Sequence, residues 1–301
     1  TVRVLDFLKK YQNNKPFFIW IHYLDLHVPY AFLPEYFKQF ENDELYKKND
    51  KILKFNPEDN LGPYDSFGSI PKVAFRENKY NLNYYIACYD AGILYTDFYI
   101  GKLLKNIKDN TIIILTADHG ESLGEHNSYF SHEVNIFDEL LHVPLIIKDN
   151  RYFKAGRKIS TAVSSVDIVP TILSRIDPFW YFFNKNKFDG IDLRGMLNGK
   201  NIGRRYIYSY FPWAWSIRDV KENIKYILYK NGRGRLYLFP DENTNYIKDN
   251  SARITKIREE LRINLKKWIE AGYPIAADIN SKKSSIDGKT MELLKSLGYL
   301  N

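Results

Sequence analysis

One stretch of sequence decides how the fold of this chain is interpreted: Thr111-Ile-Ile-Ile-Leu-Thr-Ala-Asp-His-Gly-Glu-Ser-Leu-Gly-Glu-His126. Residues 111–115 are β-branched or aliphatic and predict a buried strand. Asp118 and His119 follow it, at the strand end where open α/β sheets bind ligands. Gly120 is expected to let the backbone turn sharply, so that both side chains face one point. A metal ion or an anionic substrate is predicted at that point.

The surrounding sequence predicts an α/β fold. Apolar runs indicate further strands at 17–21 and 143–147, and apolar spacings of three, four and seven indicate a long helix over 81–107. A helix is also expected over 166–173. Strands that alternate with helices predict a mainly parallel sheet covered by helices. The polar segment 41–72 is interpreted as a surface excursion that serves as an active-site lid.

The pattern changes after residue 200. Short strands are expected at 205–210, 225–229 and 235–239, with a hairpin turn at 231–234 and a helix over 252–271. These elements predict a small antiparallel sheet with one packed helix. We therefore divide the chain into a core, residues 1–200, and a C-terminal subdomain, residues 201–301.

Composition narrows the function classes. A chain of 301 residues with 45% hydrophobic residues buries a full core, so disorder is not expected. The single cysteine, Cys88, excludes an internal disulfide and a cysteine-rich zinc site, and a buried structural thiol is expected. The net charge of +8 falls in residues 201–301 and is interpreted as a solvated basic face. No nucleic-acid motif is present, so no nucleic-acid partner is expected.

No apolar run has the length of a membrane helix, so no transmembrane segment is expected. A soluble protein is predicted. Its compartment is left open, with the cytoplasm favoured, and its oligomeric state is left open as well.

All six histidines lie between residues 22 and 142, although chance clustering of so few residues is an alternative. His27 follows the expected strand at 17–21, and His132 comes shortly after the Asp-His pair. A histidine in either place can donate to a charged oxygen or protonate a leaving group.

The order of these segments resembles the sulfatase family of the alkaline phosphatase superfamily. The resemblance rests on the strand and loop from Pro16 to Tyr30, on Tyr89–Asp97, on Thr116–His126 as the most specific match, and on Val166–Leu173. It extends over nearly the whole chain and implies an alkaline-phosphatase-like fold.

The resemblance also implies roles for single residues. Asp118 and His119 match a pair of metal ligands. His27 matches a substrate-binding histidine that assists departure of the leaving group, and His132 matches a residue that holds the transferred group. His22 and His126 are expected to support the site from behind or to be structural. His142 is expected to be structural only.

The chain departs from the family at the nucleophile. Sulfatases carry a Cys/Ser-x-Pro-x-Arg motif, modified to formylglycine, and a first pair of aspartates upstream of it; neither occurs here. Cys88 does not match that motif. The chain therefore resembles the C-terminal majority of such an enzyme and is expected to be truncated and inactive alone. Formylglycine is expected in the missing N-terminal part.

The resemblance implies metal-dependent hydrolysis of a small anionic sulfate ester. One divalent ion is expected, Ca or Mg from the oxygen ligand, or Mn or Zn because of His119. Two alternatives remain. One is a phosphodiesterase, phosphonate monoester hydrolase or phosphoglycerol transferase of the same superfamily. The other is a catalytically dead binding domain.

Overall fold

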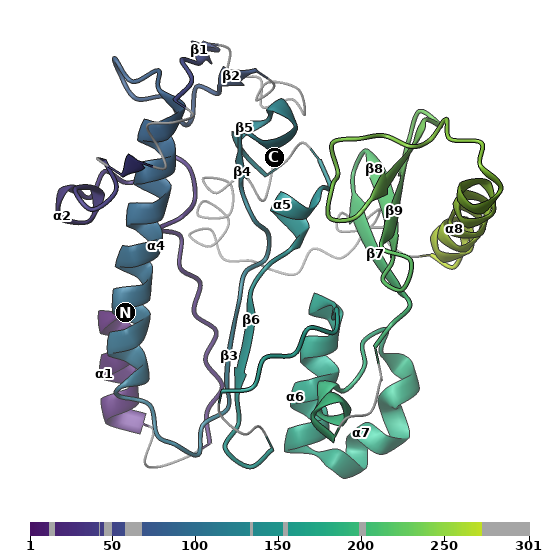
Figure 1. Ribbon diagram of the computed structural model, residues 1–301. Coiled ribbons are helices and arrows are strands. Elements are labelled where there is room, and N and C mark those ends of the chain that lie inside the picture. The colour runs from purple at the N-terminus through teal and green to yellow at the C-terminus, as the bar shows by residue number, and fades with distance from the viewer. Residues whose placement is uncertain are drawn as a thin grey trace, which may run out of the picture.

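The computed structural model describes residues 1–11, 16–41, 43–44, 50–57, 68–132, 135–152, 156–198 and 203–272 (Figure 1). The helices are α1 (Val2–Tyr11), α2 (Pro34–Phe37), α4 (Leu82–Leu104), α5 (Asp138–Leu141), α6 (Ile168–Ile176), α7 (Pro178–Asn184) and α8 (Ala252–Glu270), with short 3-10 turns η1 (Glu125–Asn127), η2 (Ser165–Asp167), η3 (Lys185–Lys187) and η4 (Leu193–Asn198). The strands are β1 (Lys54–Phe55), β2 (Ser69–Ile70), β3 (Ile113–Thr116), β4 (Ser122–Leu123), β5 (Tyr129–Ser131), β6 (Leu145–Lys148), β7 (Tyr206–Phe211), β8 (Ala214–Asp219), β9 (Ile224–Tyr229) and β10 (Gly234–Leu238).

The long helix α4 is present as predicted, but it buries a different face. Its buried residues include Ala87, Cys88, Ala91 and Gly92, whereas the expected apolar position Ile93 is 43% exposed. Small residues allow the backbone of the loop over 25–30 to approach closely. A Cβ on Gly92, for example, would lie 3.1 Å from the side chain of Leu26. The buried face of α4 therefore positions the loop that carries His27.

The expected strand at 17–21 is not formed. The segment is extended and runs between α4 and β3 in Figure 1, but it pairs with no described strand. Its side chains alternate in burial, with Phe18 and Trp20 largely exposed. The apolar run correctly indicated an extended backbone, but run length alone does not establish a pairing partner.

The strand pairing at the site differs from the parallel order we expected. β3 pairs with β6 antiparallel, from Ile113 opposite Lys148 to Thr116 opposite Leu145. Of the named strand pairs in the described ranges, the parallel one is β1 with β2. In its described part, the chain between β3 and β6 forms the hairpin of β4 and β5, the turn η1 and the four-residue helix α5, so it lacks the long crossover helix that usually joins a parallel pair.

The C-terminal sheet is antiparallel, as predicted. β10, β9, β8 and β7 are neighbours in that order, and all three pairs are antiparallel. The hairpin turn at 231–234 joins β9 to β10 as expected. The strand β8 was missed, because its Trp, Ser and Arg residues interrupt the apolar pattern. Helix α8 covers one face, with Leu261 and Leu265 buried against Ile217, Ile224 and Leu236.

The other face of this sheet packs on the part of the chain that carries α5. Ile136 and Phe137, just before α5, form a buried cluster with Ala214, Ile227 and Tyr237 of the sheet. The sheet therefore packs directly against the segment just before α5, which follows the Asp-His pair in the chain (Figure 1).

Part of the polar excursion over 41–72 lies outside the described residues. The described part forms the short pair β1 and β2, and the Gly68 amide donates to the carbonyl of Asn127 over 2.9 Å. This contact places the excursion beside the loop between β4 and β5. Residues 273–301, the end of the expected C-terminal subdomain, are also outside the described ranges.

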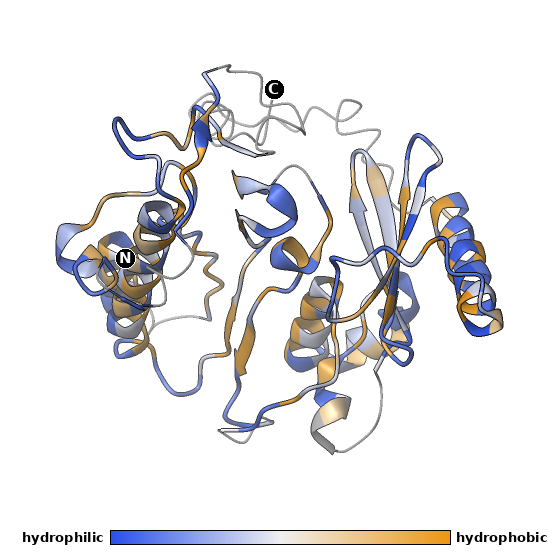
Figure 2. Ribbon diagram, turned by 45° about the horizontal axis from the view of Figure 1, so that its top comes forward, coloured by the Kyte–Doolittle hydropathy of each residue, from blue (hydrophilic) through white to orange (hydrophobic). Residues whose placement is uncertain are grey.

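Apolar and polar residues alternate along α8 (Figure 2), and its buried residues Ile254, Ile257, Leu261 and Leu265 pack with the C-terminal sheet. Within the described ranges, no helix combines the length and the apolar character that crossing a bilayer requires.

Candidate active site

Three segments bring titratable side chains together at the end of β3. β3 delivers Asp118 and His119. The loop held against α4 delivers His22 and His27. The turn after β5 delivers His132. Two pairs of imidazole rings are in contact, His119 with His132 and His27 with His132.

Asp118 lies at the centre of one half of this cluster. Its Oδ2 atom is 3.8 Å from Nε2 of His22 and 3.9 Å from Nε2 of His119. The carboxylate is about half exposed, so solutes reach it. Two imidazole nitrogens and a carboxylate oxygen thus face one accessible region.

The backbone fixes the orientation of His119. Its Nδ1 atom is 2.7 Å from the carbonyl oxygen of Gly120, which accepts only, so Nδ1 carries the proton in that contact. In the neutral ring, Nε2 is then left with a lone pair on the side of Asp118. This arrangement is the one found in metal-ligating histidines.

His27 and His132 form the other half of the cluster. Their ring centroids are 5.0 Å apart, and His132 stacks on His119 at 4.0 Å with an interplanar angle of 14°. Nδ1 of His27 contacts the carbonyl oxygen of Val28 at 2.6 Å. Its Nε2 atom is buried and has no hydrogen-bond partner among the described residues. Such an atom is suited to an incoming polar ligand, because a buried polar group without a partner is costly.

Glu121 is a site residue that we did not predict. Its Oε1 atom lies 3.7 Å from Nδ1 of His132, and both side chains are nearly buried. Tyr30 is buried on the same side. Burial and the negative charge of Glu121 raise the pKa of the Tyr30 hydroxyl well above its usual value. The sequence did offer one indication that Glu121 belongs to the site, because it directly follows the Asp-His-Gly turn.

His126 lies outside the cluster and is held by other groups. Nδ1 is 2.9 Å from Oε1 of Glu139, Nε2 is 3.1 Å from the carbonyl oxygen of Glu242, and the ring stacks on Phe137 at 3.6 Å. Burial alone would lower the pKa of His126, but the hydrogen bond and charge of Glu139 outweigh it, so the pKa is raised. His126 connects the site loop to the segment after β10.

The remaining candidates are not in the cluster. His142 is an exposed residue at the end of α5, where its amide donates to the carbonyl of Asp138. Cys88 is buried in α4, and burial raises the pKa of its thiol to about 11. A thiol with that pKa stays protonated at neutral pH and is a poor nucleophile.

The side chains of Asp118 and His119 are chemically suited to a divalent ion. Ligand atoms about 2.0–2.2 Å from a common ion lie roughly 3–4 Å from each other, as the Asp118 and His119 atoms do. Among the described residues, however, no group of three or more His, Cys, Asp or Glu side chains is arranged as a metal site. The pair by itself offers two donor atoms to such an ion.

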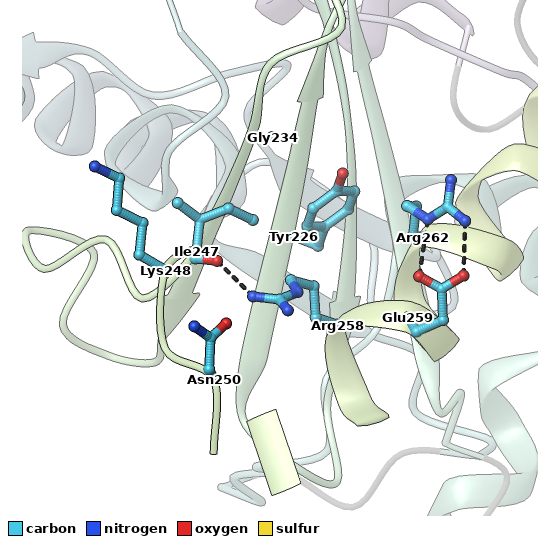
Figure 3. Close-up of a pocket in the computed structure, with 8 residues that line it drawn as sticks. All are labelled: Tyr226, Gly234, Ile247, Lys248, Asn250, Arg258, Glu259 and Arg262. Atoms are coloured by element: carbon cyan, nitrogen blue, oxygen red, sulfur yellow. Dashed lines mark hydrogen bonds and ion pairs between the residues drawn. The ribbon is translucent and has the colours of Figure 1, made fainter. Parts of the chain in front are cut away.

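A cavity of about 720 Å³ lies elsewhere, between the C-terminal sheet and α8 (Figure 3). It shares no residue with the histidine cluster. Its arginines are already engaged, since Arg258 donates to the carbonyl of Ile247 and Arg262 pairs with Glu259. It contains no histidine, cysteine or serine, so the histidine cluster is the better candidate for chemistry.

Comparison with known proteins identifies the family. The sequence model of the sulfatase family matches residues 1–177, more than half of the chain.

The chain belongs to the sulfatase family.

Two similar relatives of this sulfatase-family chain are the uncharacterized sulfatase YidJ of Escherichia coli (strain K12) and arylsulfatase K of Xenopus laevis. YidJ is 28% identical over 182 residues, which cover 58% of this chain and 35% of YidJ. Arylsulfatase K is 28% identical over 183 residues, which cover 54% of this chain and 32% of that protein. The chain thus spans about a third of the length of the relatives it matches.

The fold is alkaline-phosphatase-like, as expected. The phosphonate monoester hydrolase of Agrobacterium radiobacter superposes with a TM-score of 0.67, covering 90% of this chain and 59% of that structure. At 21% sequence identity this likeness concerns the fold alone.

Proposed function

We propose that this chain supplies the anion-binding part of the active site of a metal-dependent hydrolase of sulfate esters. The observation that supports it best is a series of contacts: His22 and His119 lie beside the accessible carboxylate of Asp118, His132 stacks on His119, and His27 contacts His132. Imidazole groups that can donate hydrogen bonds beside a potential metal ligand suit the binding of a sulfate group. Membership of the sulfatase family supports the same reaction class.

Asp118 and His119 are the proposed metal ligands, and His22 is a further donor at a similar distance from Asp118. A bound divalent ion would supply Lewis-acid polarisation of the ester group. The carboxylate suits Ca or Mg, whereas the imidazoles favour Mn or Zn, so all four ions belong in the test.

His27 and His132 are proposed to bind the charged oxygens of the ester. Nε2 of His27 is buried and has no partner among the described residues, so it can meet the leaving oxygen. Because Nδ1 is engaged with the Val28 carbonyl, His27 would protonate that oxygen only as the imidazolium. His132 would hold the oxygens that stay on sulfur, with the Glu121 carboxylate 3.7 Å from its Nδ1 atom. Donors of this kind are commonly worth ~3–4 kcal/mol each in the transition state.

The covalent nucleophile is not assigned to any residue of this chain. No residue matches the family motif that is modified to formylglycine, and the Cys88 thiol is buried in a helix. In this proposal formylglycine belongs to the whole protein, and the chain alone is expected to give no meaningful turnover of an aryl sulfate. Robust turnover by this chain alone would show that another group performs the attack.

Metal titration tests the proposed ligands. Isothermal titration of the chain with Mn²⁺, Zn²⁺, Ca²⁺ and Mg²⁺ should give one site, and Asp118→Asn and His119→Gln should each weaken it by roughly tenfold or more. The matched control is His142→Gln, an exposed histidine outside the cluster, which should bind metal like the wild type. Absence of any metal binding would instead favour a binding domain without catalysis.

A second titration addresses substrate class. In the metal-loaded chain, inorganic sulfate and methylphosphonate should compete for the cluster, with His27→Gln weakening both. Tighter binding of the phosphonate would favour the phosphonate monoester hydrolase alternative.

A further inference from the structure

The cavity between the C-terminal sheet and α8 has the size of a ligand site. Its volume of about 720 Å³ lies in the range of pockets that hold small organic molecules, roughly 300–1,000 Å³. Tyr226 of β9 lies in the middle of it, with Lys248 and Asn250 from the loop after β10 and Arg258 and Arg262 from α8 around it (Figure 3). The lining therefore comes from three separate elements of the folded subdomain.

Positive charge prevails in and around this cavity. Its lining includes three cations and one carboxylate, namely Lys248, Arg258, Arg262 and Glu259. Asp249, the neighbour of Lys248 in the chain, adds a second carboxylate, so cations still outnumber carboxylates by three to two. The excess extends over the subdomain, because residues 203–272 contain 15 basic and 8 acidic residues. Anions are therefore attracted to this part of the molecule.

Both carboxylates beside the cavity already have partners. The two oxygens of Glu259 accept from Nε and Nη2 of Arg262, at 3.0 and 2.6 Å. Oδ1 of Asp249 accepts from the amide of Ser251 over 2.8 Å. Neither Glu259 nor Asp249 forms an ion pair with Lys248 or Arg258.

Arg258 and Lys248 keep their charge available. Arg258 donates to the carbonyls of Ile247 and Asp249, which hold the guanidinium in place without neutralising it. The Lys248 side chain is exposed and forms no ion pair with a described residue. One cation is thus fixed in position and the other can adjust to a ligand, and both suit the oxygens of sulfate and phosphate groups.

We propose that this cavity binds a small molecule that carries more than one sulfate or phosphate group. Lys248 and Arg262 lie on opposite sides of Tyr226 in Figure 3, so two anionic groups on one molecule suit the cavity better than a single ion. The ring and hydroxyl of Tyr226 would contact the part of the ligand between them. A nucleic acid is a poorer ligand, because Tyr226 is the one aromatic residue of the lining and bases stack on successive rings.

The site is independent of the proposed hydrolytic function, since the cavity shares no residue with the histidine cluster. Its binding should therefore need no metal ion. This difference allows the two sites to be measured separately in the same chain.

Isothermal titration in the presence of EDTA tests the site, with sucrose octasulfate and inositol hexakisphosphate as ligands. The wild type should bind at one site, and Lys248→Gln/Arg262→Gln should weaken binding by roughly tenfold or more. The tighter of the two ligands identifies sulfate or phosphate as the preferred group. The matched control is Lys266→Gln/Lys267→Gln, which removes the same charge from two exposed lysines of α8 outside the cavity and should change binding by less than about threefold.

A second measurement requires no variant and so does not depend on its folding. Bound ligand should protect Lys248 from acetylation, as mass spectrometry detects it, and leave Lys266 and Lys267 reactive. The proposal is overturned if neither ligand binds, if the control loses as much binding as the cavity variant, or if all three lysines are protected alike. It is also overturned if His27→Gln abolishes the binding, because the ligand would then occupy the histidine cluster.

Discussion

Gly120 shows how closely the site turn is packed. We expected glycine there for a sharp turn, but Gly120 does not adopt a left-handed backbone conformation. Glycine is required here because the backbone of α5 comes too close to leave room for a side chain. A Cβ at this position would overlap the carbonyl oxygen of Glu139, and the Gly120 amide donates to the carbonyl of Leu140 over 2.8 Å. The residue after the Asp-His pair is thereby fastened to α5.

Gly120→Ala is expected to destabilise the protein by roughly 1–3 kcal/mol, because the backbone of α5 must move to admit the methyl group. Chemical denaturation measures this. Gly101→Ala in α4 is the control, since its Cβ would meet nothing within 4 Å, and it should stabilise the helix by about 0.5–1 kcal/mol. Equal effects of both variants would contradict the close-packing argument.

The two proposed oxyanion donors are expected to differ in their dependence on the leaving group. In the whole enzyme, His27→Ala should lower kcat more on an alkyl sulfate than on a nitrophenyl sulfate, because a good leaving group needs little proton assistance. His132→Ala should lower kcat on both esters alike. Steady-state kinetics on the two esters decides this, and wild-type rates for both variants would remove these residues from the site.

At the scale of elements, the loop between β4 and α5 is held by one histidine. Both ring nitrogens of His126 face acceptors, the Glu139 carboxylate and the Glu242 carbonyl. Only the imidazolium donates to both. This loop also carries His132, so the charge on His126 helps to keep that part of the site in place.

The raised pKa of His126 predicts a pH-dependent stability. A group whose folded pKa is raised stabilises the fold fully below its unfolded pKa, about 6.5, and this contribution is lost as pH rises through the folded pKa. The difference in thermal midpoint between wild type and His126→Gln should therefore shrink from about pH 6 to about pH 9.

The partner of His126 provides the control for this titration. Glu139→Gln removes the charge that raises the pKa, so its midpoint should vary less with pH over the same interval. A wild-type difference that stays constant with pH would mean that His126 does not titrate there.

At the scale of the whole molecule, a buried lysine joins the C-terminal sheet to the site region. Lys225 on β9 is 1% exposed, and its Nζ atom lies 3.1 Å from Asp138 and 2.8 Å from Glu242. Glu242 also accepts from the amide of Asp138 over 2.7 Å. Lys225 therefore lies between two carboxylates, Asp138 at the start of α5 and Glu242 after β10, and Arg218 also pairs with Asp138 at 3.3 Å.

Lys225→Met should cost about 3–5 kcal/mol, since it leaves the nearly buried carboxylate of Glu242 without its cation, whereas Asp138 keeps Arg218. Arg253→Met is the control, because Arg253 forms an exposed pair with Glu222 worth at most about 1 kcal/mol. Denaturant unfolding followed by circular dichroism measures both. A loss below about 1 kcal/mol for Lys225→Met would show that the carboxylates become protonated or hydrated at little cost.

The sequence by itself determined the local elements and the chemistry at the end of β3. Periodicity predicted α4 and α8, the hairpin between β9 and β10 followed from its turn residues, and the Asp118-His119 pair stood out at a strand end. These features depend on neighbours a few positions away, so local pattern is sufficient. The family followed from the same motifs in their order.

Only the tertiary structure decided which distant groups meet. It brought His22 to Asp118 and His27 to His132, placed Glu121 beside His132, and paired β3 antiparallel with β6. It also buried the small-residue face of α4 and set His126 against a carbonyl 116 positions away. From the sequence alone, many segments could pair with a given apolar strand, and many groups could bond a given buried polar atom. Packing of the whole chain selects one, because close approach of backbones and pairing of buried charges depend on all the elements together.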